Sequence, residues 1–148
     1  MQQNPDNDLT YLLRILESIQ KIHLYASPYD DVLDFFFAND QKDFNASLML
    51  IINIGEQATR LSDSLKSDYP AIPWRLVVGF RNRVAHDYAG LDTFKVFDLI
   101  KNHLTPLKER IEALINDRLL NNSLWKEELT IAKNSTYYKH IDFARLVK

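Results

Sequence analysis

Hydrophobic residues recur three, four and seven positions apart along most of this chain, which is the spacing of one face of an α-helix. The first such stretch carries Leu9, Leu12, Leu13, Leu16, Ile19 and Ile22. The 148 residues include Gly 3 and Pro 5, too few turn-forming residues for a many-stranded β fold. With 46% hydrophobic and 26% charged residues, a chain of this length can bury one core. We therefore expect an all-α protein folded as an antiparallel helical bundle.

Capping and turn-forming residues divide the chain into the expected helices. The expected boundaries are 8–26, a short helix opened by Ser27 and Pro28, 41–66, 74–86, and 93–118 with a kink at Pro106. The middle of the third helix, 47–58, is apolar nearly all round, so we expect it to be the central buried helix. Gly90 and Asp92 are expected to end one helix and to cap the next.

We expect two parts within one domain. Residues 1–118 are expected to form the bundle, and residues 119–148 one or two appended helices packed on it. The first part holds 13 basic and 17 acidic residues and the second part 5 and 3. The net charge of −2 argues against a protein that coats duplex DNA, so contact with nucleic acid must be local, through a few arginines or the tail.

Several classes of protein are excluded by what the sequence lacks. With Cys 0 there is no disulfide framework, no thiolate zinc site and no cysteine nucleophile. The four histidines are scattered, so neither a tight metal site nor a metal cofactor is expected: His23, His86, His103 and His140. There is no apolar run of membrane-spanning length and no signal segment, so we expect a cytoplasmic protein.

One segment concentrates chemically useful side chains, since Arg81, Asn82, His86 and Tyr88 lie within eight positions. Arg81 and Tyr88 fall within about 20° of each other on a helix, and Asn82 and His86, four apart, share another stripe. Asn82 can therefore hold one nitrogen of the His86 ring. Arg81 and His86 point about 140° apart, so one helix cannot easily aim both at one target. Two copies of the helix related by a two-fold axis could bring them into a shared cleft.

These side chains suit the cleavage of RNA without a metal. A histidine near its reference pKa can take the proton of a 2′-hydroxyl group, and an arginine can clamp the phosphate that this oxygen attacks. The alternative is a structural one: a solvated arginine, and a histidine placed where it favours the helix dipole.

The segment resembles the signature of the HEPN superfamily, an arginine followed after four to six residues by a histidine. It is similar to the HepT-like toxins of MNT–HEPN (type VII) toxin–antitoxin pairs, whose version is Arg, four residues, His, one residue, Tyr. Arg81, His86 and Tyr88 fill these places. The resemblance extends over about 8–117 through an ordered series: Ile54-Gly55-Glu56, Leu61-Ser62, Tyr69-Pro70-x-Ile72-Pro73-Trp74, the motif, and Leu104-x-Pro106-Leu107.

The resemblance implies a homodimeric bundle of the HEPN type whose motif helices face each other across a cleft. It implies a metal-independent endoribonuclease toxin with Arg81 and His86 as the catalytic pair and Asn82 supporting His86. It also implies a cognate MNT-type nucleotidyltransferase antitoxin that adds AMP to Tyr88. An anionic nucleotide beside Arg81 would take the place of the substrate phosphate. The expected substrate is RNA, with no membrane or specific DNA partner and no cofactor.

Other residues keep two interpretations. Gly55 is expected to permit close approach of two helices, and Glu56 to pair with Arg81 or Arg60. Arg75 and Arg83 could contact the RNA backbone or simply be solvated. Asp87 could raise the pKa of His86 or repel phosphate. The tail aromatics favour packing: Trp125, Tyr137, Tyr138 and Phe143. The alternative function for the whole chain is a non-catalytic module that binds a nucleotidyltransferase or a nucleotide.

Overall fold

The computed structural model describes residues 7–86 and 92–146, without the side chains of Arg83, Ala85 and His86. The described residues are mostly helical, and no strand occurs among them. The elements are α1 Asp8–Ala26, α2 Val32–Phe37, η2 Ala38–Gln41, α3 Lys42–Arg60, α4 Asp63–Asp68, α5 Trp74–His86, α6 Thr93–Asp98, η4 Leu99–His103, α7 Leu104–Leu119, α8 Ser123–Lys133, η5 Thr136–Tyr138 and η6 Phe143–Leu146. The expected all-α fold is confirmed.

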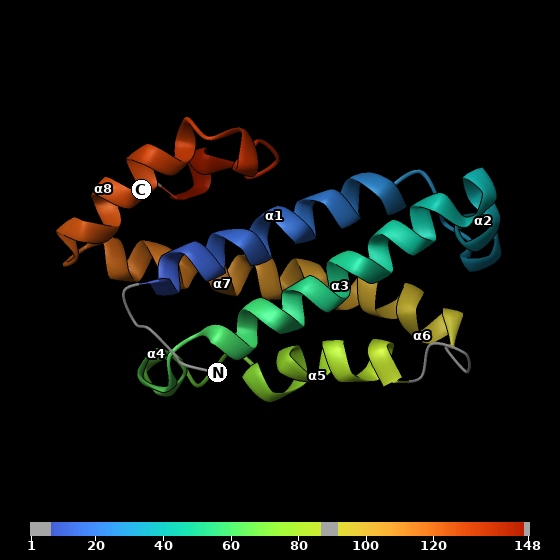
Figure 1. Cartoon of the computed structure of the whole chain (residues 1–148), viewed down its shortest axis with the longest axis horizontal. Coiled ribbons are helices and arrows are strands. Elements are labelled where there is room, and N and C mark those ends of the chain that lie inside the picture. The colour runs from blue at the N-terminus through green and yellow to red at the C-terminus, as the bar shows by residue number, and fades with distance from the viewer. Residues whose placement is uncertain (1–6, 87–91, 147–148) are drawn as a thin grey trace.

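The long helices form an antiparallel bundle (Figure 1). Helices α1 and α3 run in opposite directions beside each other, α5 packs on the other side of α3, and α7 also packs against α1. The last helix, α8, and the turns after it lie beside α1 and α7, at the far side of the bundle from α5. No described helix combines the length and the apolar character needed to cross a membrane.

Helix α1 supplies more buried hydrophobic side chains to the core than any other described helix. Leu9, Leu12, Ile15, Ile19 and Ile22 are all completely buried. Each such side chain contributes roughly 1.5–3 kcal/mol relative to leaving it in water. At one end of the bundle the ring of Phe35 packs against Phe44 and Phe97, with centroids 5.8 Å apart in both pairs.

Helix α3 is not buried all round, which corrects the sequence-based expectation. It lies between α1 and α5 (Figure 1), but Met49 is 65% exposed and Ile52, Asn53 and Glu56 are half-buried. Two neighbouring helices cover only two sides of a cylinder, so one face of α3 stays open to solvent even though its residues are largely apolar.

The second helix begins later than the sequence indicates. Ser27 ends α1 by donating its backbone N–H to the carbonyl of His23 at 2.8 Å. The cap of α2 is Asp31, whose carboxylate accepts the N–H of Asp34 at 3.1 Å. A carboxylate on the residue just before the helix satisfies an otherwise unpaired N–H, and Asp31 provides it where Ser27 does not.

The predicted helix 41–66 is two helices. Helix α3 ends at Arg60, Leu61 is extended, and the Ser62 hydroxyl accepts the N–H of Leu65 to cap α4. The buried carboxylate of Asp8 then accepts the N–H of Ser62 at 2.9 Å and its hydroxyl at 2.6 Å. The break is stabilised because backbone N–H groups at the start of α4 are bonded by side chains.

The predicted helix 93–118 is nearly continuous, and its irregularity lies before the proline. Asp92 caps α6 as expected, accepting the N–H groups of Phe94 and Lys95. The five residues of η4 form a widened π-helical turn directly before α7, which contains Pro106. Proline has no N–H and its ring crowds the carbonyl four residues earlier, here that of Asn102, so a wider turn at this place relieves the clash.

The C-terminal residues are attached to the bundle by buried side chains and by two carboxylates. Trp125, Leu129, Ile141 and Leu146 are buried against the core. The Glu17 carboxylate accepts the backbone N–H of His140 at 2.8 Å and lies 2.6 Å from its Nδ1. The Glu112 carboxylate accepts Nε of Arg145 at 2.9 and 3.0 Å. Tyr137, by contrast, is 83% exposed, so only part of the aromatic set is used in packing.

Candidate active site

The crossing of α3 and α5 is made close by a glycine. A Cβ atom on Gly55 would lie 2.7 Å from the backbone nitrogen of Arg81 and 2.8 Å from its Cβ. These distances are shorter than non-bonded atoms tolerate, so only glycine fits here without moving the backbone of α5. The expectation that Gly55 permits close helix approach is confirmed, and the point of contact is Arg81 itself.

Arg81 is held by an ion pair across this crossing. Its Nε contacts Oε1 of Glu56, the residue next to Gly55, and the Arg81 side chain remains 47% exposed. Its Nη1 lies 3.5 Å from Oδ1 of Asn82. Of the two arginines expected as partners of Glu56, it is Arg81 that binds. The Glu56 carboxylate contacts the guanidinium at Nε. An arginine binds a phosphate through two of its N–H groups, and the terminal Nη groups are distinct from the Nε that Glu56 contacts.

The rest of α5 orients Arg81 and Asn82 outward. Val77, Phe80 and Val84 are buried against the core, which fixes the rotation of the helix about its axis. Arg81 and Asn82 follow Phe80 directly and are exposed.

Trp74, the first residue of α5, is also buried, and its indole N–H donates to the carbonyl of Tyr69 at 3.1 Å. Arg75 is exposed but lies about 120° around the helix from Arg81, so α5 does not bring the two together on one stripe.

The other motif residues are placed only in part. His86 is the last residue of α5, five positions after Arg81, and its side chain lies outside the described residues, as does that of Arg83. Asp87, Tyr88 and Gly90 also lie outside them. The contact between Asn82 and His86 and the role of Tyr88 therefore stay predictions.

The remaining histidines are engaged away from Arg81. His103 lies 3.3 Å from Asp98, and His23 lies 3.4 Å from the hydroxyl of Thr105. Burial, with a smaller contribution from Lys108 and Lys101, holds the pKa of His23 below its usual value of 6.5. As far as side chains are described, no group of three His, Cys, Asp or Glu residues could hold a metal ion together.

A polar network between α1 and α3 was not predicted from the sequence. Arg14 Nη1 donates to Oε1 of Gln57 at 3.5 Å, Gln57 Nε2 donates to Oδ1 of Asn53 at 3.0 Å, and Asn53 Nδ2 donates to Oγ of Ser18 at 2.9 Å. The sequence feature that could have indicated this network is the presence of two amide side chains, Asn53 and Gln57, four residues apart in a largely apolar helix. The network and the Arg81 ion pair share helix α3, where Gln57 directly follows Glu56.

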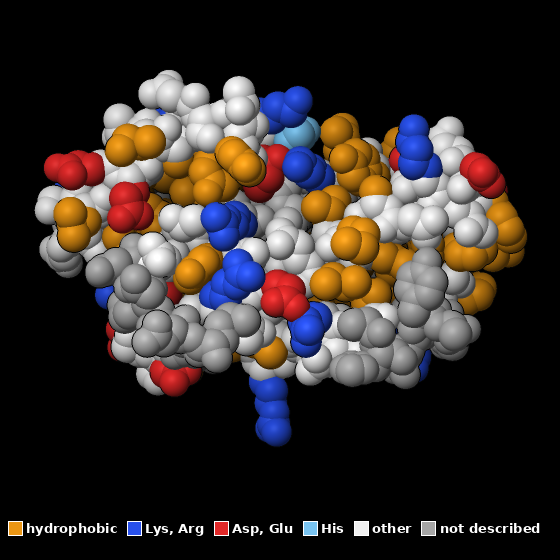
Figure 2. Space-filling view, in the orientation of Figure 1, with side chains coloured by type: hydrophobic (Ala, Val, Ile, Leu, Met, Phe, Trp, Pro, Cys, Tyr) orange, Lys and Arg blue, Asp and Glu red, His pale blue; other side chains and the backbone are white. Residues whose placement is uncertain are grey.

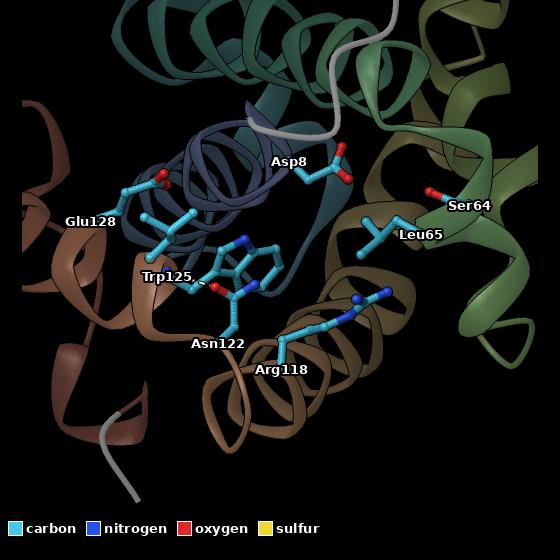
Figure 3. Close-up of a pocket in the computed structure, with 8 residues that line it drawn as sticks. Asp8, Ser64, Leu65, Arg118, Asn122, Trp125 and Glu128 are labelled. Atoms are coloured by element: carbon cyan, nitrogen blue, oxygen red, sulfur yellow. Dashed lines mark hydrogen bonds between the residues drawn. The ribbon is translucent and has the colours of Figure 1, made fainter.

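A separate pocket lies where α4, α7 and α8 meet the start of α1 (Figure 3). It measures about 230 Å³. Its polar side chains serve the fold: Asp8 binds Ser62, Arg118 binds Asp68 at 2.6 Å, and Asn122 caps α8 by accepting the N–H of Trp125. None of the described motif residues lines this pocket, and its polar side chains are used by the fold, so we interpret it as a joint between elements.

Comparison with known proteins places this geometry in a family. Residues 15–114 match the family described as Ribonuclease HepT-like. The chain belongs to the HepT-like ribonuclease family. The matched range contains Gly55, Glu56, Arg81 and His86, so the α3–α5 crossing lies inside the HepT-like region, whereas α8 and the residues after it lie outside. The fold described above is accordingly the all-α HEPN type.

Individual relatives are distant in sequence, and the matched region spans nearly all of the first two below and about half of the third. The chain is 27% identical to Putative RNase MJ0125 of Methanocaldococcus jannaschii over 66% of this chain and 91% of that protein. It is 28% identical to Probable ribonuclease HepT of Thermococcus cleftensis over 70% of this chain and 92% of that protein. Gamma-glutamylcyclotransferase and putative RNase MJ0434 of M. jannaschii is 30% identical over 86% of this chain and 51% of that protein. No solved structure matches the HepT-like chain significantly.

Proposed function

We propose that this protein is a metal-independent endoribonuclease in which Arg81 and His86 cleave RNA. The observation that carries the proposal is the setting of Arg81. Its backbone is fixed by contact with Gly55 and its Nε by Glu56, yet half of its side chain stays open to solvent. An arginine fixed in this way is suited to holding a phosphate group. Membership of the HepT-like family and the names of the relatives support ribonuclease activity.

The proposed reaction is an internal transfer within the RNA. His86, with its imidazole neutral, takes the proton of a 2′-hydroxyl group, and the 2′-oxygen attacks the adjacent phosphorus. The bond to the 5′-oxygen breaks, a proton returns to that oxygen, and the products are a 2′,3′-cyclic phosphate and a 5′-hydroxyl. Arg81 balances the negative charge that grows on the phosphoryl oxygens. Acid–base catalysis of this kind contributes roughly 10²- to 10⁴-fold in rate.

We place the complete site between two copies of the chain. Arg81 and His86 point about 140° apart on one helix, and a two-fold axis could bring one protomer's arginine near its partner's histidine. Exposed hydrophobic side chains on α3, α5 and α6 supply apolar surface that a second copy could cover: Met49, Leu76 and Phe94 are 65%, 43% and 62% exposed. Figure 2 shows hydrophobic side chains gathered over α2 and the neighbouring end of α3.

We further propose that the enzyme is the toxin of a type VII toxin–antitoxin pair and acts in the cytoplasm. Its partner would be an MNT-type nucleotidyltransferase that transfers AMP from ATP to the hydroxyl of Tyr88 and releases pyrophosphate. The added phosphate would lie near Arg81 and neutralise the group that binds substrate. Residues 119–148 are proposed to be an extension of the same domain rather than a second one.

The catalytic proposal is tested by giving the purified protein RNA in the presence of EDTA. Cleavage is expected to persist, and to fall by about 10²-fold or more in both Arg81→Ala and His86→Ala. Arg110→Ala, which removes an exposed arginine on α7, is the matched control and should cleave normally. Cleavage that ignores both motif substitutions would overturn the proposal and leave the non-catalytic module as the alternative.

The regulatory proposal is tested by intact mass after co-expression with the partner and ATP. The mass should rise by AMP groups in the unsubstituted protein and stay unchanged in Tyr88→Phe. An unmodified mass in the unsubstituted protein would contradict Tyr88 as the acceptor. Growth arrest on expression of the chain alone, relieved by the partner, would support the toxin assignment.

A further inference from the structure

A polar groove crosses the α1–α3 face and is closed at one side by the C-terminal tail. Its volume is about 500 Å³. Three elements supply side chains that can recognise a nucleic acid: Arg14 and Lys21 from α1, Asn53 and Gln57 from α3, and Tyr137 and Tyr138 from η5. The groove contains cations, amides and aromatic rings together, which is the combination that single-stranded nucleic acids require.

The cations of the groove are held but accessible. Arg14 is exposed, its Nη1 donates to Gln57 at 3.5 Å, and its guanidinium lies 5.9 Å from the centre of the Tyr11 ring. Lys21 is half-buried with its Nζ 3.5 Å from Glu17. The carboxylate of Glu17 also lines the groove, is 8% exposed and pairs with both His140 and Lys21, so it offsets one of the two cations and leaves the groove with a net positive charge.

The aromatic rings lie at the edge of the groove where bases could stack. Tyr137 is 83% exposed, and its ring centre lies 6.4 Å from that of Tyr138. A tyrosine this exposed contributes little to the fold. Stacking of a base on such a ring is strong and tolerates any base, because every base has a flat face.

The groove and the Arg81 site share helix α3. Gln57, which binds Arg14, directly follows Glu56, which binds Arg81. Figure 2 shows Lys and Arg side chains spread over this face along α1 and α3, between the tail and α5. A single strand that occupies the groove and continues along α3 would run toward the ion pair of Arg81.

We infer that the groove between α1, α3 and η5 binds the part of a single-stranded RNA that flanks the cleaved bond. Arg14 and Lys21 contact its phosphates, and Tyr137 stacks on a base. The inference deepens the proposed function and rests on RNA being the substrate. Because η5 lies outside the range 15–114 that matches the HepT-like family, the aromatic edge of the groove is supplied by the extension of the present chain, whereas Lys21, Asn53 and Gln57 lie within the matched range.

Binding is tested without cleavage, in full-length His86→Ala protein with a labelled oligouridine of about 12 nucleotides, by fluorescence anisotropy over a range of salt. Replacing both cations, Arg14→Gln with Lys21→Gln, should weaken binding about tenfold and lower the slope of log affinity against log salt by about 1.4, since each phosphate contact contributes about 0.7. Tyr137→Ala should weaken binding about tenfold at an unchanged slope, and Tyr137→Phe should restore it.

The matched control is Lys126→Gln with Lys133→Gln, which removes the same charge from exposed positions on α8. If this pair weakens binding as much as the groove pair, or if the groove variants bind normally, the inference is wrong. An oligoglutamate peptide that binds as tightly and through the same residues would instead make the groove a docking site for an acidic protein. If RNA binds through the groove as expected but the unsubstituted protein does not cleave RNA in EDTA, the proposed catalysis is wrong and the inferred binding groove is retained.

Discussion

The carboxylate that binds Arg81 and the carboxylates that hold the tail differ in how deeply they are buried. The carboxylates that bind the tail, Glu17 on α1 and Glu112 on α7, are 8% and 7% exposed. At the α3–α5 crossing, Glu56 is 27% and Arg81 47% exposed. A buried carboxylate must keep its partners, because leaving one unpaired is costly, whereas an exposed pair is worth little and can be broken by a ligand. The burial of the carboxylate therefore distinguishes pairs that stabilise the fold from a pair that a substrate can displace.

The largest expected effect comes from the glycine that brings the exposed pair together. Gly55→Ala places a methyl group against the backbone of Arg81, and we expect it to lower the free energy of unfolding by about 3 kcal/mol and RNA cleavage at least tenfold. The comparison variant is Gly79→Ala on α5, where an added Cβ has nothing within 4 Å. It should gain up to about 1 kcal/mol, since alanine is the better helix former. Urea unfolding of both variants checks this, and equal effects would contradict the close crossing.

The buried anchor comes next. Glu17→Gln removes the charge that binds His140 and Lys21, and we expect a loss of about 2 kcal/mol in the free energy of unfolding. The kcat of RNA cleavage should change little, because Glu17 lies on α1 and makes no contact with Arg81, whereas KM should rise, because Glu17 lines the groove proposed to bind RNA and holds the tail that carries Tyr137. Hydrogen exchange of the His140 amide should accelerate in this variant. An unchanged exchange rate would show that the carboxylate does not hold the tail.

Substitution in the exposed pair of Glu56 and Arg81 should affect cleavage more than stability. Glu56→Gln is expected to cost less than about 1 kcal/mol in stability, as for other partly exposed pairs. It should lower cleavage about tenfold, because the guanidinium loses the partner that orients it. The effect belongs in kcat rather than in the stability of the fold. A large loss of stability with normal cleavage would show that the pair of Glu56 and Arg81 stabilises the fold rather than orients a catalytic group.

The smallest effect concerns a histidine that belongs to neither pair. Burial, then Lys108 and Lys101, lowers the pKa of His23 in the folded protein below 6.5. The unfolded chain therefore binds this proton more readily, so the stability contributed by neutral His23 is complete above pH 6.5 and is lost as the pH falls through the folded pKa. In His23→Gln the free energy of unfolding should depend less on pH below 6.5. An identical pH dependence in the two proteins would show that His23 is not the group responsible.

The sequence predicted those features that one segment specifies by itself. The spacing of leucines and isoleucines predicted α1, the turn-forming residues before Trp74 predicted the start of α5, and the residue pair Gly55-Glu56 predicted both the close approach and the ion pair. The break after Arg60 was missed because it depends on Asp8, 54 positions away from Ser62. Periodicity reports which side of a helix is apolar, and it does not report which distant side chain will meet its end.

The same limit applies to the site. Arg81 could be singled out because its neighbours in sequence form a motif, whereas Arg14 carries no local signal and gains its setting only from Gln57, 43 positions away. His140 gains its partner Glu17 from α1, 123 positions earlier, and no residue near His140 in the sequence indicates this contact. Contacts between α1 and the tail are made by the fold and cannot be read from either segment alone.

The bond between Asp8 and Ser62 has a practical consequence for shortened or tagged forms of the protein. Asp8 lies in the first turn of α1, yet its carboxylate stabilises the start of α4 on the other side of the junction. A truncation that begins after this residue would remove the acceptor of two donors in a different helix, and would loosen the loop leading to Trp74. Fusion partners and cleavage sites for purification therefore belong ahead of Asp8, with spacer residues between.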